Sequence, residues 1–435
     1  MTTIDMQDTL LAGIDDFLVG RQSEPSWRRS IREEALERFR REGLPNTRDE
    51  EWLYTPVTSL VDANYPLAPH VQVAPGDVDQ FLFQGFEGPQ LVFVNGRYVP
   101  ALSRTRDLPP GVRLTSLAAL VESSPSLVEP HFGRAVQFRQ RGFTALNEAW
   151  NTDGAVLIVD ADVEVATPVH VLYYSTGAGA SHPRTLVVAG RHARVSLVET
   201  FAGEVGTPYF VNAVTEVLVD EGGYVDHYKV QRESNQAHHI ASMHLHLSRT
   251  ADVATHNITL GGRLTRNDVN AELAGEGIEC TVNGLYLVDG DRLVDNHTAI
   301  DHAKPHCHSY EIYKGVLDDA GRGVFNGKIF VREDAQKTDA KQTNQVLLLS
   351  DDATIDTKPQ LEIYADDVKC THGATVGQLS AEALFYLRAR GIAKDDARAL
   401  LVHAFAEDIV DRIRIDSVRR ALEQVLLARL PIRDS

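Results

Sequence analysis

GGYVDHYKV (residues 222–230), ADVATHNITL (251–260) and EGIECTVNGLYL (276–287) are three phrases of one kind, each a turn signal followed by alternating apolar residues. Alternation with a period of two is typical of a β-strand that buries one face. No proline occurs between Tyr209 and Lys304, as expected where many strand amides must stay free for hydrogen bonds. The sequence therefore predicts a long region of short β-strands.

This strand phrase recurs along the chain. Related phrases are ARVSLVE, GRGVFNGKIFV and DATIDTKPQLEI, and most intervals are about thirty residues, with one longer gap across residues 286–321. Such a period favours an irregular solenoid of stacked β-coils. A β-sandwich remains the alternative, although it gives no reason for a recurring phrase. The alternation begins near Ala193, Tyr224, Val253, Ile278, Val324 and Thr354.

Helical segments flank the β-region. Apolar stripes at residues 10–18 and 27–39 predict two helices, and Asn95-Gly96 in LVFVNGRYV predicts a hairpin with a type I′ turn. Helical periodicity returns after Gly377. The fold class is therefore mainly β, in three units. These are an N-terminal helical and mixed α/β region (1–150), a β-solenoid core (151–377) and a C-terminal helical domain (378–435).

The composition is that of an acidic folded protein. Of the 435 residues, 43% are hydrophobic, and 43 basic against 61 acidic residues give a net charge of −18. A surface of this sign repels phosphates and anionic lipids, so we expect neither a nucleic-acid partner nor a membrane partner. Three cysteines are too few for a disulfide framework, and the N-terminus does not resemble a secretory signal. These features favour a cytoplasmic protein.

Common catalytic motifs are missing from the sequence. There is no G-x-S-x-G elbow, no H-E-x-x-H zinc helix and no C-x-x-C pair. Gly327-Lys328 is not part of a phosphate-binding P-loop, because Arg322 and Ile329 stand where that motif needs glycine and Ser or Thr. We therefore expect no catalytic residue and no nucleotide bound by this chain alone.

The first of two histidine and cysteine groupings is NHTAIDHAKPHCHS, residues 296–309. Imidazole and thiolate are good ligands for iron, zinc or copper. The spacing does not match a closed tetrahedral site, and a solvated histidine loop is the alternative. The grouping contains His297, His302, His306, Cys307 and His308.

The second grouping is ADDVKCTHGATVG, residues 365–377. If this segment is a strand, Cys370 and His372 project from the same face because they are two residues apart. A thiolate beside an imidazole suits iron or an iron-sulfur cluster, where histidine can replace cysteine. The alternative is a buried structural cysteine followed by a capping histidine.

Residues 356–392, DTKPQLEIYADDVKCTHGATVGQLSAEALFYLRARGI, resemble a signature of the SufB/SufD family, scaffold subunits of the Suf iron-sulfur cluster assembly system. TRDEEWLYTP (47–56), GRGVFNGKIFV and KTDAKQTNQVLLLS extend the resemblance over most of the chain. Within the family, the SufB pattern has glutamate after the motif histidine. Gly373 occupies that place here, which favours the SufD branch.

This resemblance implies a right-handed parallel β-helix between helical domains, paired with SufB through the β-helix and bound to the ATPase SufC through the helices after Ser380. It implies that His372 and Cys370 handle a transient iron-sulfur cluster or iron at the SufB interface, and His302 and Cys307 align with ligand-type residues of some relatives. Reduced flavin is expected on the complex, and the isolated chain is expected to form a homodimer through an exposed β-helix edge.

Two other functions are left open. One is a purely structural adaptor that recruits SufC and supports SufB without any ligand role. The other is a carbohydrate-active β-helix enzyme, which needs a pair of carboxylic acids in a substrate groove.

Overall fold

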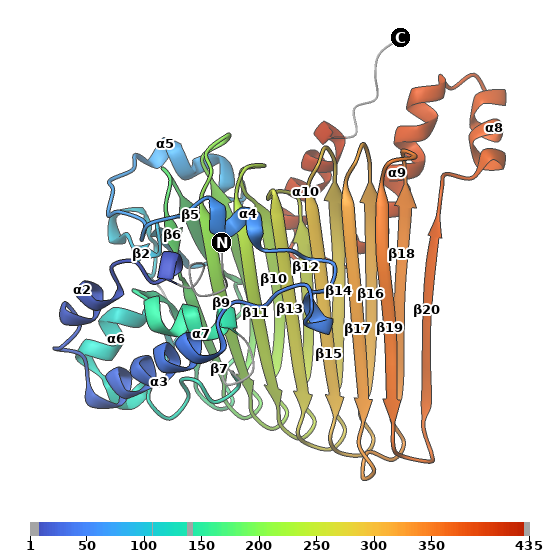
Figure 1. The fold of residues 1–435 in the computed structure, drawn as a ribbon. Coiled ribbons are helices and arrows are strands. Elements are labelled where there is room, and N and C mark those ends of the chain that lie inside the picture. The colour runs from blue at the N-terminus through green and yellow to red at the C-terminus, as the bar shows by residue number, and fades with distance from the viewer. Residues whose placement is uncertain (1–7, 107, 137–141, 430–435) are drawn as a thin grey trace.

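The chain folds as a parallel β-solenoid with helices at both ends (Figure 1). The computed structural model describes residues 8–106, 108–136 and 142–429. Among these residues, two sheets of ten strands each form the solenoid, and from β7 onward successive strands of the chain alternate between them. The predicted solenoid is confirmed. The β-sandwich is wrong, because neighbouring solenoid strands pair in parallel and the chain crosses to the other sheet between them.

Sheet I has the strand order β2-β1-β5-β8-β10-β12-β14-β16-β18-β20. Its strands are β1 (Gln90–Val94), β2 (Arg97–Tyr98), β5 (Val169–Ser175), β8 (Arg194–Gly203), β10 (Tyr224–Arg232), β12 (Asp252–Thr259), β14 (Glu279–Val288), β16 (His308–Leu317), β18 (Asp339–Leu348) and β20 (Lys369–Gly377).

Sheet II has the strand order β19-β17-β15-β13-β11-β9-β7-β4-β3, with β6 also paired to β9. Its strands are β3 (Val112–Ser116), β4 (Gly154–Val159), β6 (Ala180–Ser181), β7 (Arg184–Ala189), β9 (Phe210–Val219), β11 (His238–Leu247), β13 (Leu264–Leu273), β15 (Leu293–His302), β17 (Arg322–Val331) and β19 (Thr354–Ile363).

The repeated phrases lie on both sheets. Those that begin near residues 193, 224, 253 and 278 form β8, β10, β12 and β14 of sheet I, whereas those near 324 and 354 form β17 and β19 of sheet II. The long gap between them is filled by β15 and β16. The predicted period of about thirty residues was therefore right. However, the first four phrases belong to sheet I and the last two to sheet II, which is a shift of half a coil.

Stacked apolar columns form the core of the solenoid. Val195, Val225, Val253 and Cys280 lie opposite one another in consecutive strands of sheet I, and all four are buried. Full burial of one such aliphatic side chain contributes about 1.5–3 kcal/mol, so each added coil extends the same stabilising contact. Cys280 is a core residue, and burial raises the pKa of its thiol to about 12.

The turns at one end of the coils repeat a hydrogen bond. Gly222, Thr250 and Gly277 each have positive φ, and each donates its amide to the corresponding turn of the next coil, with donor–acceptor distances of 2.8–3.2 Å. The backbone amides of these tight turns are therefore satisfied by the stacking itself.

The N-terminal part packs against the first coils. The predicted hairpin is confirmed, since β1 and β2 pair antiparallel across Asn95 (φ 50°) and Gly96 (φ 72°). This part also adds β1 and β2 to sheet I and β3 to sheet II. The helices here are α2 (Ile14–Val19), α3 (Ser26–Glu42), α4 (Thr58–Asp62), α5 (Pro75–Val78), α6 (Leu117–Ser123) and α7 (Gly142–Trp150).

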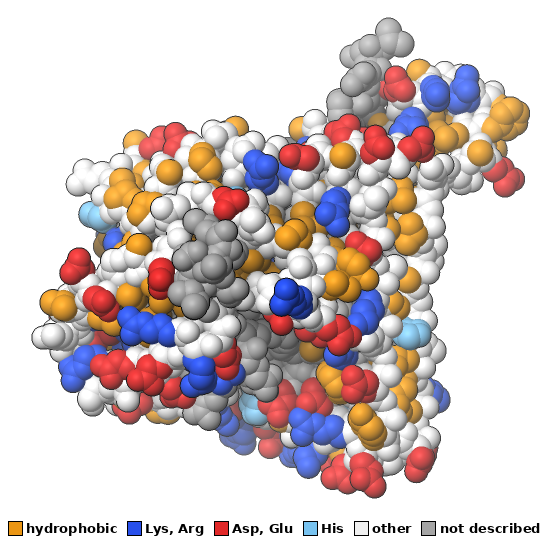
Figure 2. Space-filling model, in the orientation of Figure 1, with side chains coloured by type: hydrophobic (Ala, Val, Ile, Leu, Met, Phe, Trp, Pro, Cys, Tyr) orange, Lys and Arg blue, Asp and Glu red, His pale blue; other side chains and the backbone are white. Residues whose placement is uncertain are grey.

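Among the described residues, three helices follow the solenoid: α8 (Ala381–Ala389), α9 (Lys394–Val410) and α10 (Asp416–Arg429). Val402 and Ile409 of α9 and Leu422 of α10 pack in one apolar cluster with outer side chains of sheet I. α8 has no buried residue and projects from the body (Figures 1 and 2). Its Phe385 side chain is 73% exposed. None of the described helices has the length and apolar composition of a membrane span.

Candidate functional site

Cys370 and His372 lie on β20, the terminal strand of sheet I (Figure 1). β20 pairs with β18, where Ala340 is opposite Cys370 and Gln342 is opposite His372. No described strand pairs with its other edge. The predicted strand is confirmed, and two residues separated by one position on a strand share a face.

The shared face is the inner face of the solenoid. Cys370 is half-buried against the cluster that contains Ile329, Val331 and Ala340. His372 has the same orientation along the strand, but it is exposed because β20 belongs to the last coil. The imidazole is therefore accessible at the open end of the solenoid.

The Cys370 thiol is in its neutral form. Burial raises the pKa of this thiol, and the negative charge of Asp339 acts in the same direction. A metal ion or cluster that binds here must displace the proton, because the thiolate is the ligand form of cysteine. Binding at this position should therefore release a proton.

Apolar side chains surround the open end of the solenoid. Ile363 ends β19, Tyr364 follows it and Val376 lies on β20, and all three are exposed, Tyr364 to 65%. Exposed apolar residues beside an unpaired strand edge are typical of a surface that another protein covers.

His302 and Cys307 have different hydrogen-bond partners. His302 is buried at the end of β15, 2.9 Å from the Ser309 hydroxyl, and burial lowers its pKa to about 4. Cys307 is buried in the following turn, where its thiol donates to the carbonyl oxygens of Gly275 (3.2 Å) and Pro305 (3.5 Å). Burial raises the pKa of this thiol. Both side chains have local structural partners.

The other two histidines of this grouping, His306 and His308, differ in their surroundings. His308 is exposed and bonds to Glu279 at 2.6 Å, while His306 occupies a turn position with φ of 59°. Within residues 8–106, 108–136 and 142–429, no three His, Cys, Asp or Glu side chains are grouped as metal ligands.

Residues 47–56, here called the strap, lie across the outer face of sheet II. Polar contacts join the strap to that face. The Trp52 ring packs on Arg266, with 3.9 Å between the ring centre and the guanidinium carbon. Thr55 donates a 2.6 Å hydrogen bond to Asp295. Glu50, in the short 3-10 helix Glu50–Trp52, forms an ion pair with Lys358. Periodicity did not assign this segment, because polar contacts with distant coils hold it.

His297 joins the strap to the sheet. Its ring nitrogens lie 3.1 Å from Glu51 and 3.0 Å from Asp295. Burial and the charge of Arg266 act to lower the pKa of His297, but the two carboxylates outweigh them and the pKa is raised. His297 is a candidate metal ligand from the sequence, and the structure places it in this ion-pair network.

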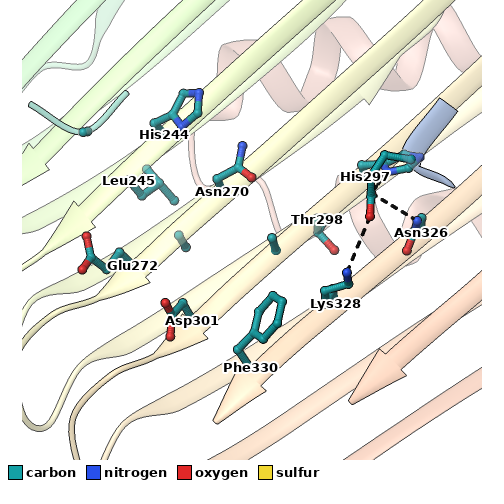
Figure 3. Close-up of a pocket in the computed structure, with 14 residues that line it drawn as sticks. His244, Leu245, Asn270, Glu272, His297, Thr298, Asp301, Asn326, Lys328 and Phe330 are labelled. Atoms are coloured by element: carbon teal, nitrogen blue, oxygen red, sulfur yellow. Dashed lines mark hydrogen bonds and ion pairs between the residues drawn. The ribbon is translucent and has the colours of Figure 1, made fainter. Parts of the chain in front are cut away.

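A pocket of about 380 Å³ opens beside the strap (Figure 3). Asn326 and Lys328 lie next to His297 at one end, and Glu272 and Asp301 lie at the other. Neither His372 nor Cys370 lines this pocket, so it is distinct from the open end of the solenoid.

Two family models match the chain. Residues 172–405 match the model described as "SUF system FeS cluster assembly, SufBD core domain", and residues 19–171 match "SufBD protein N-terminal region". The first covers the coils that carry Cys370 and His372, and the second covers the strap.

Several relatives align over most of the chain. It is 31% identical to the iron-sulfur cluster assembly protein SufD of Escherichia coli, over 94% of this chain and 95% of that protein. Identity is 33% to a SufBD family protein of Synechocystis, over 89% and 87% of the two chains, and 27% to SufD of Bacillus subtilis, over 93% and 94%. The chain belongs to the SufBD family of iron-sulfur cluster assembly proteins, and its similarity to SufD extends over nearly its whole length.

Proposed function

We propose that this chain is a non-enzymatic scaffold of iron-sulfur cluster assembly, which pairs with SufB, binds the ATPase SufC and handles nascent cluster or iron at His372. One observation carries the proposal. His372 and Cys370 share the inner face of the last coil, where His372 is exposed beside an unpaired strand edge. The sparse cysteines and acidic surface favour the cytoplasm as the compartment.

The two side chains offer part of a ligand set. Imidazole and thiolate both bind iron, and an iron-sulfur cluster is commonly held by four protein ligands. A cluster at this position therefore takes further ligands from the subunit that covers the open end. The cluster is cargo that passes through the site. Cys370 loses its proton only when the cluster binds.

The same open end suits the proposed pairing. β20 presents free backbone donors and acceptors, and Ile363, Tyr364 and Val376 add exposed apolar area. A partner solenoid can continue the sheet there, which places its own terminal coil next to His372. A second copy of this chain can use the same edge when SufB is absent, which would give the expected homodimer.

The function predicts a specific defect for His372→Ala. The full-length variant should enter the complex with SufB and SufC, but anaerobic reconstitution should yield about tenfold less cluster, because an iron ligand is lost. Iron and acid-labile sulfide per complex are the measurements, and Cys370→Ala is tested separately. His192→Ala, which removes another exposed histidine, is the matched control. A normal cluster yield from the intact His372→Ala complex would leave only the structural adaptor role.

SufC docking is proposed at α8. Phe385 and Tyr386 are exposed on this projecting helix, which packs little against the rest of the chain. The double substitution Phe385→Ser and Tyr386→Ser should weaken SufC binding at least about 100-fold, since buried aromatic anchors dominate such interfaces. Isothermal titration calorimetry measures the change. Leu427→Ser, at an exposed apolar position of α10, should leave the affinity unchanged. Equal losses in both variants would argue against α8 as the dock.

The carbohydrate-enzyme alternative needs a pair of carboxylic acids, one with a raised pKa. Glu272 and Asp301 lie opposite each other on β13 and β15 and line the same pocket. However, Glu272 bonds to His246 and Asp301 pairs with Arg332, and the first contact lowers the pKa of Glu272. These acids do not match a glycosidase pair. Reduced flavin on the complex remains part of the proposal, with no residue of this chain assigned to it.

A further inference from the structure

A column of polar side chains lies behind His372 inside the solenoid. In sheet I, Glu311 on β16 is opposite Gln342 on β18, which is opposite His372 on β20. Glu311 and Gln342 are each 1% exposed. On β14, the residue opposite Glu311 is the apolar Val282. The polar column therefore covers three strands, counted inward from the open end.

Gln342 links the column. Its amide nitrogen donates a 2.7 Å hydrogen bond to Oε2 of Glu311, so the NH₂ group points inward, away from the open end. Its carbonyl oxygen is buried and has no hydrogen-bond partner among the described residues. Burying an unpaired carbonyl costs free energy, which suggests that it has a partner in the working protein. The next residue of the column toward the open end is His372.

The opposite sheet leaves room for this amide. A Cβ atom added to Gly327 on β17 would lie 2.2 Å from the Gln342 amide nitrogen. Any larger residue at position 327 would therefore displace the amide from Glu311.

A second buried carboxylate provides a comparison. Glu199, deeper in the solenoid, bonds to Thr185 at 2.6 Å, to Thr215 at 3.0 Å and to His227 at 2.8 Å. Both of its oxygens are satisfied by core residues. Glu311 differs, since its Oε1 has no hydrogen-bond partner among the described residues. Of these two buried carboxylates, the one with an unpaired oxygen thus belongs to the column that leads to the open end.

We propose that Gln342 and Glu311 are positioning residues for His372. When the imidazole turns inward, one ring N–H donates to the Gln342 carbonyl oxygen, while the Gln342 amide donates to Glu311. This fixes the tautomer and leaves the other ring nitrogen free to face iron or a cluster, as second ligand shells do for metal-binding histidines. The inference rests on the proposed function of His372.

The charge of Glu311 changes near neutral pH. Burial raises the pKa of this carboxyl to about 7, against the opposing effect of the hydrogen bond from Gln342. The titratable groups near it are Cys280 on β14 and Tyr313 on its own strand, and burial raises the pKa of both, so they stay neutral. β15 and β17 present Thr298 and Gly327, and β18 presents Gln342. An ionised Glu311 polarises the Gln342 amide and strengthens its carbonyl as an acceptor.

The first experiment measures the imidazole in the full chain without partners. Modification of His372 by diethyl pyrocarbonate is followed by peptide mass spectrometry from pH 6 to 8, and its rate is divided by that of the exposed His192. We expect this ratio to rise about threefold as Glu311 ionises. An effect of this size is expected from a partly screened charge two strands away. Glu311→Gln and Gln342→Met should each give a flat ratio.

Asn344→Leu is the matched control. It removes a buried amide of the same strand whose hydrogen bond runs to Thr357 and whose opposite residue on β20 is Ala374. This variant should keep the threefold rise. A flat ratio in the wild-type chain, or an unchanged rise in Gln342→Met, would overturn the inference.

The second experiment uses the complex with SufB and SufC. Gln342→Met should bind both partners normally and lower the cluster yield about three- to tenfold. Glu311→Gln should remove any rise in reconstitution rate between pH 6 and 8. If His372→Ala assembles clusters normally, the proposed function fails, while the modification ratio still decides whether the column acts on His372. A normal cluster yield in Gln342→Met, with His372→Ala defective, would overturn the positioning role.

Discussion

Lowering the pH from 7 to 4 is expected to unfold the chain cooperatively. Burial lowers the pKa of His170, His182 and His256 to about 3, and that of His238 to about 4. His302 adds a fifth such group. These rings are neutral in the folded protein, whereas an unfolded histidine has a pKa of about 6.5. The unfolded chain therefore takes up protons that the folded chain cannot.

The sign and the size follow from proton linkage. A histidine with a lowered pKa contributes stability above pH 6.5, and this contribution is lost as the pH falls toward its folded pKa. One group with a folded pKa near 3 loses up to about 3 kcal/mol by pH 4, so several together match a total stability of about 5–15 kcal/mol. Circular dichroism against pH, with urea midpoints at each pH, measures the transition.

The variant His170→Met tests whether buried neutral histidines cause the acid unfolding. His170 packs against Phe83 and Phe86, and its Nδ1 atom has no hydrogen-bond partner among the described residues. Removing this one titratable ring should move the acid midpoint to lower pH, even if the variant is less stable at pH 7. A wild-type urea midpoint that stays constant from pH 7 to 4 would contradict the explanation.

Arg184→Met should cost about 3–5 kcal/mol of unfolding free energy, the range for breaking a buried ion pair. Arg184 is buried and bonds to Glu148 at 2.6 Å and to Glu216 at 2.5 Å. Its guanidinium also lies 4.2 Å from the Phe132 ring centre. Without Arg184, the Gly133 amide is the one remaining donor to Glu216 among the described residues. Urea denaturation at pH 7 measures the loss.

Two comparisons test the origin of this effect. Arg191→Met removes a solvent-exposed ion pair with Asp162 and should cost less than about 0.5 kcal/mol. Adding Glu216→Gln to Arg184→Met should recover part of the stability, because a neutral amide is less costly to bury than an unpaired carboxylate. No recovery in the double variant would mean that packing, and not charge, accounts for the loss.

The sequence predicted the solenoid because its inner positions repeat along every coil. The half-coil error arose because strands of sheets I and II show the same alternation, so periodicity cannot assign a phrase to a sheet. β16 was missed since its inward positions include Ser309, Glu311 and Gly315, which weaken the apolar pattern. Polar residues at inward positions were the signal that sequence reasoning overlooked.

The candidate site was predictable only in part. Strand alternation put Cys370 and His372 on one face, since that relation spans two residues. The links from His372 to Gln342 and Glu311 depend on the register between strands about thirty residues apart. The strap contacts depend on which coil lies under residues 47–56. Neither relation has a local sequence signal, and both needed the three-dimensional structure.

The strap imposes an order on synthesis. Glu50 and its partner Lys358 are separated by 308 residues, and Thr55 meets Asp295 across 240. At about 5–20 residues per second, a ribosome makes Lys358 about 15–60 s after Glu50. During that interval the strap has no completed binding surface, and its aromatic residues are available to other proteins. The last coils therefore determine both when the open end forms and when the first part of the chain is finally held in place.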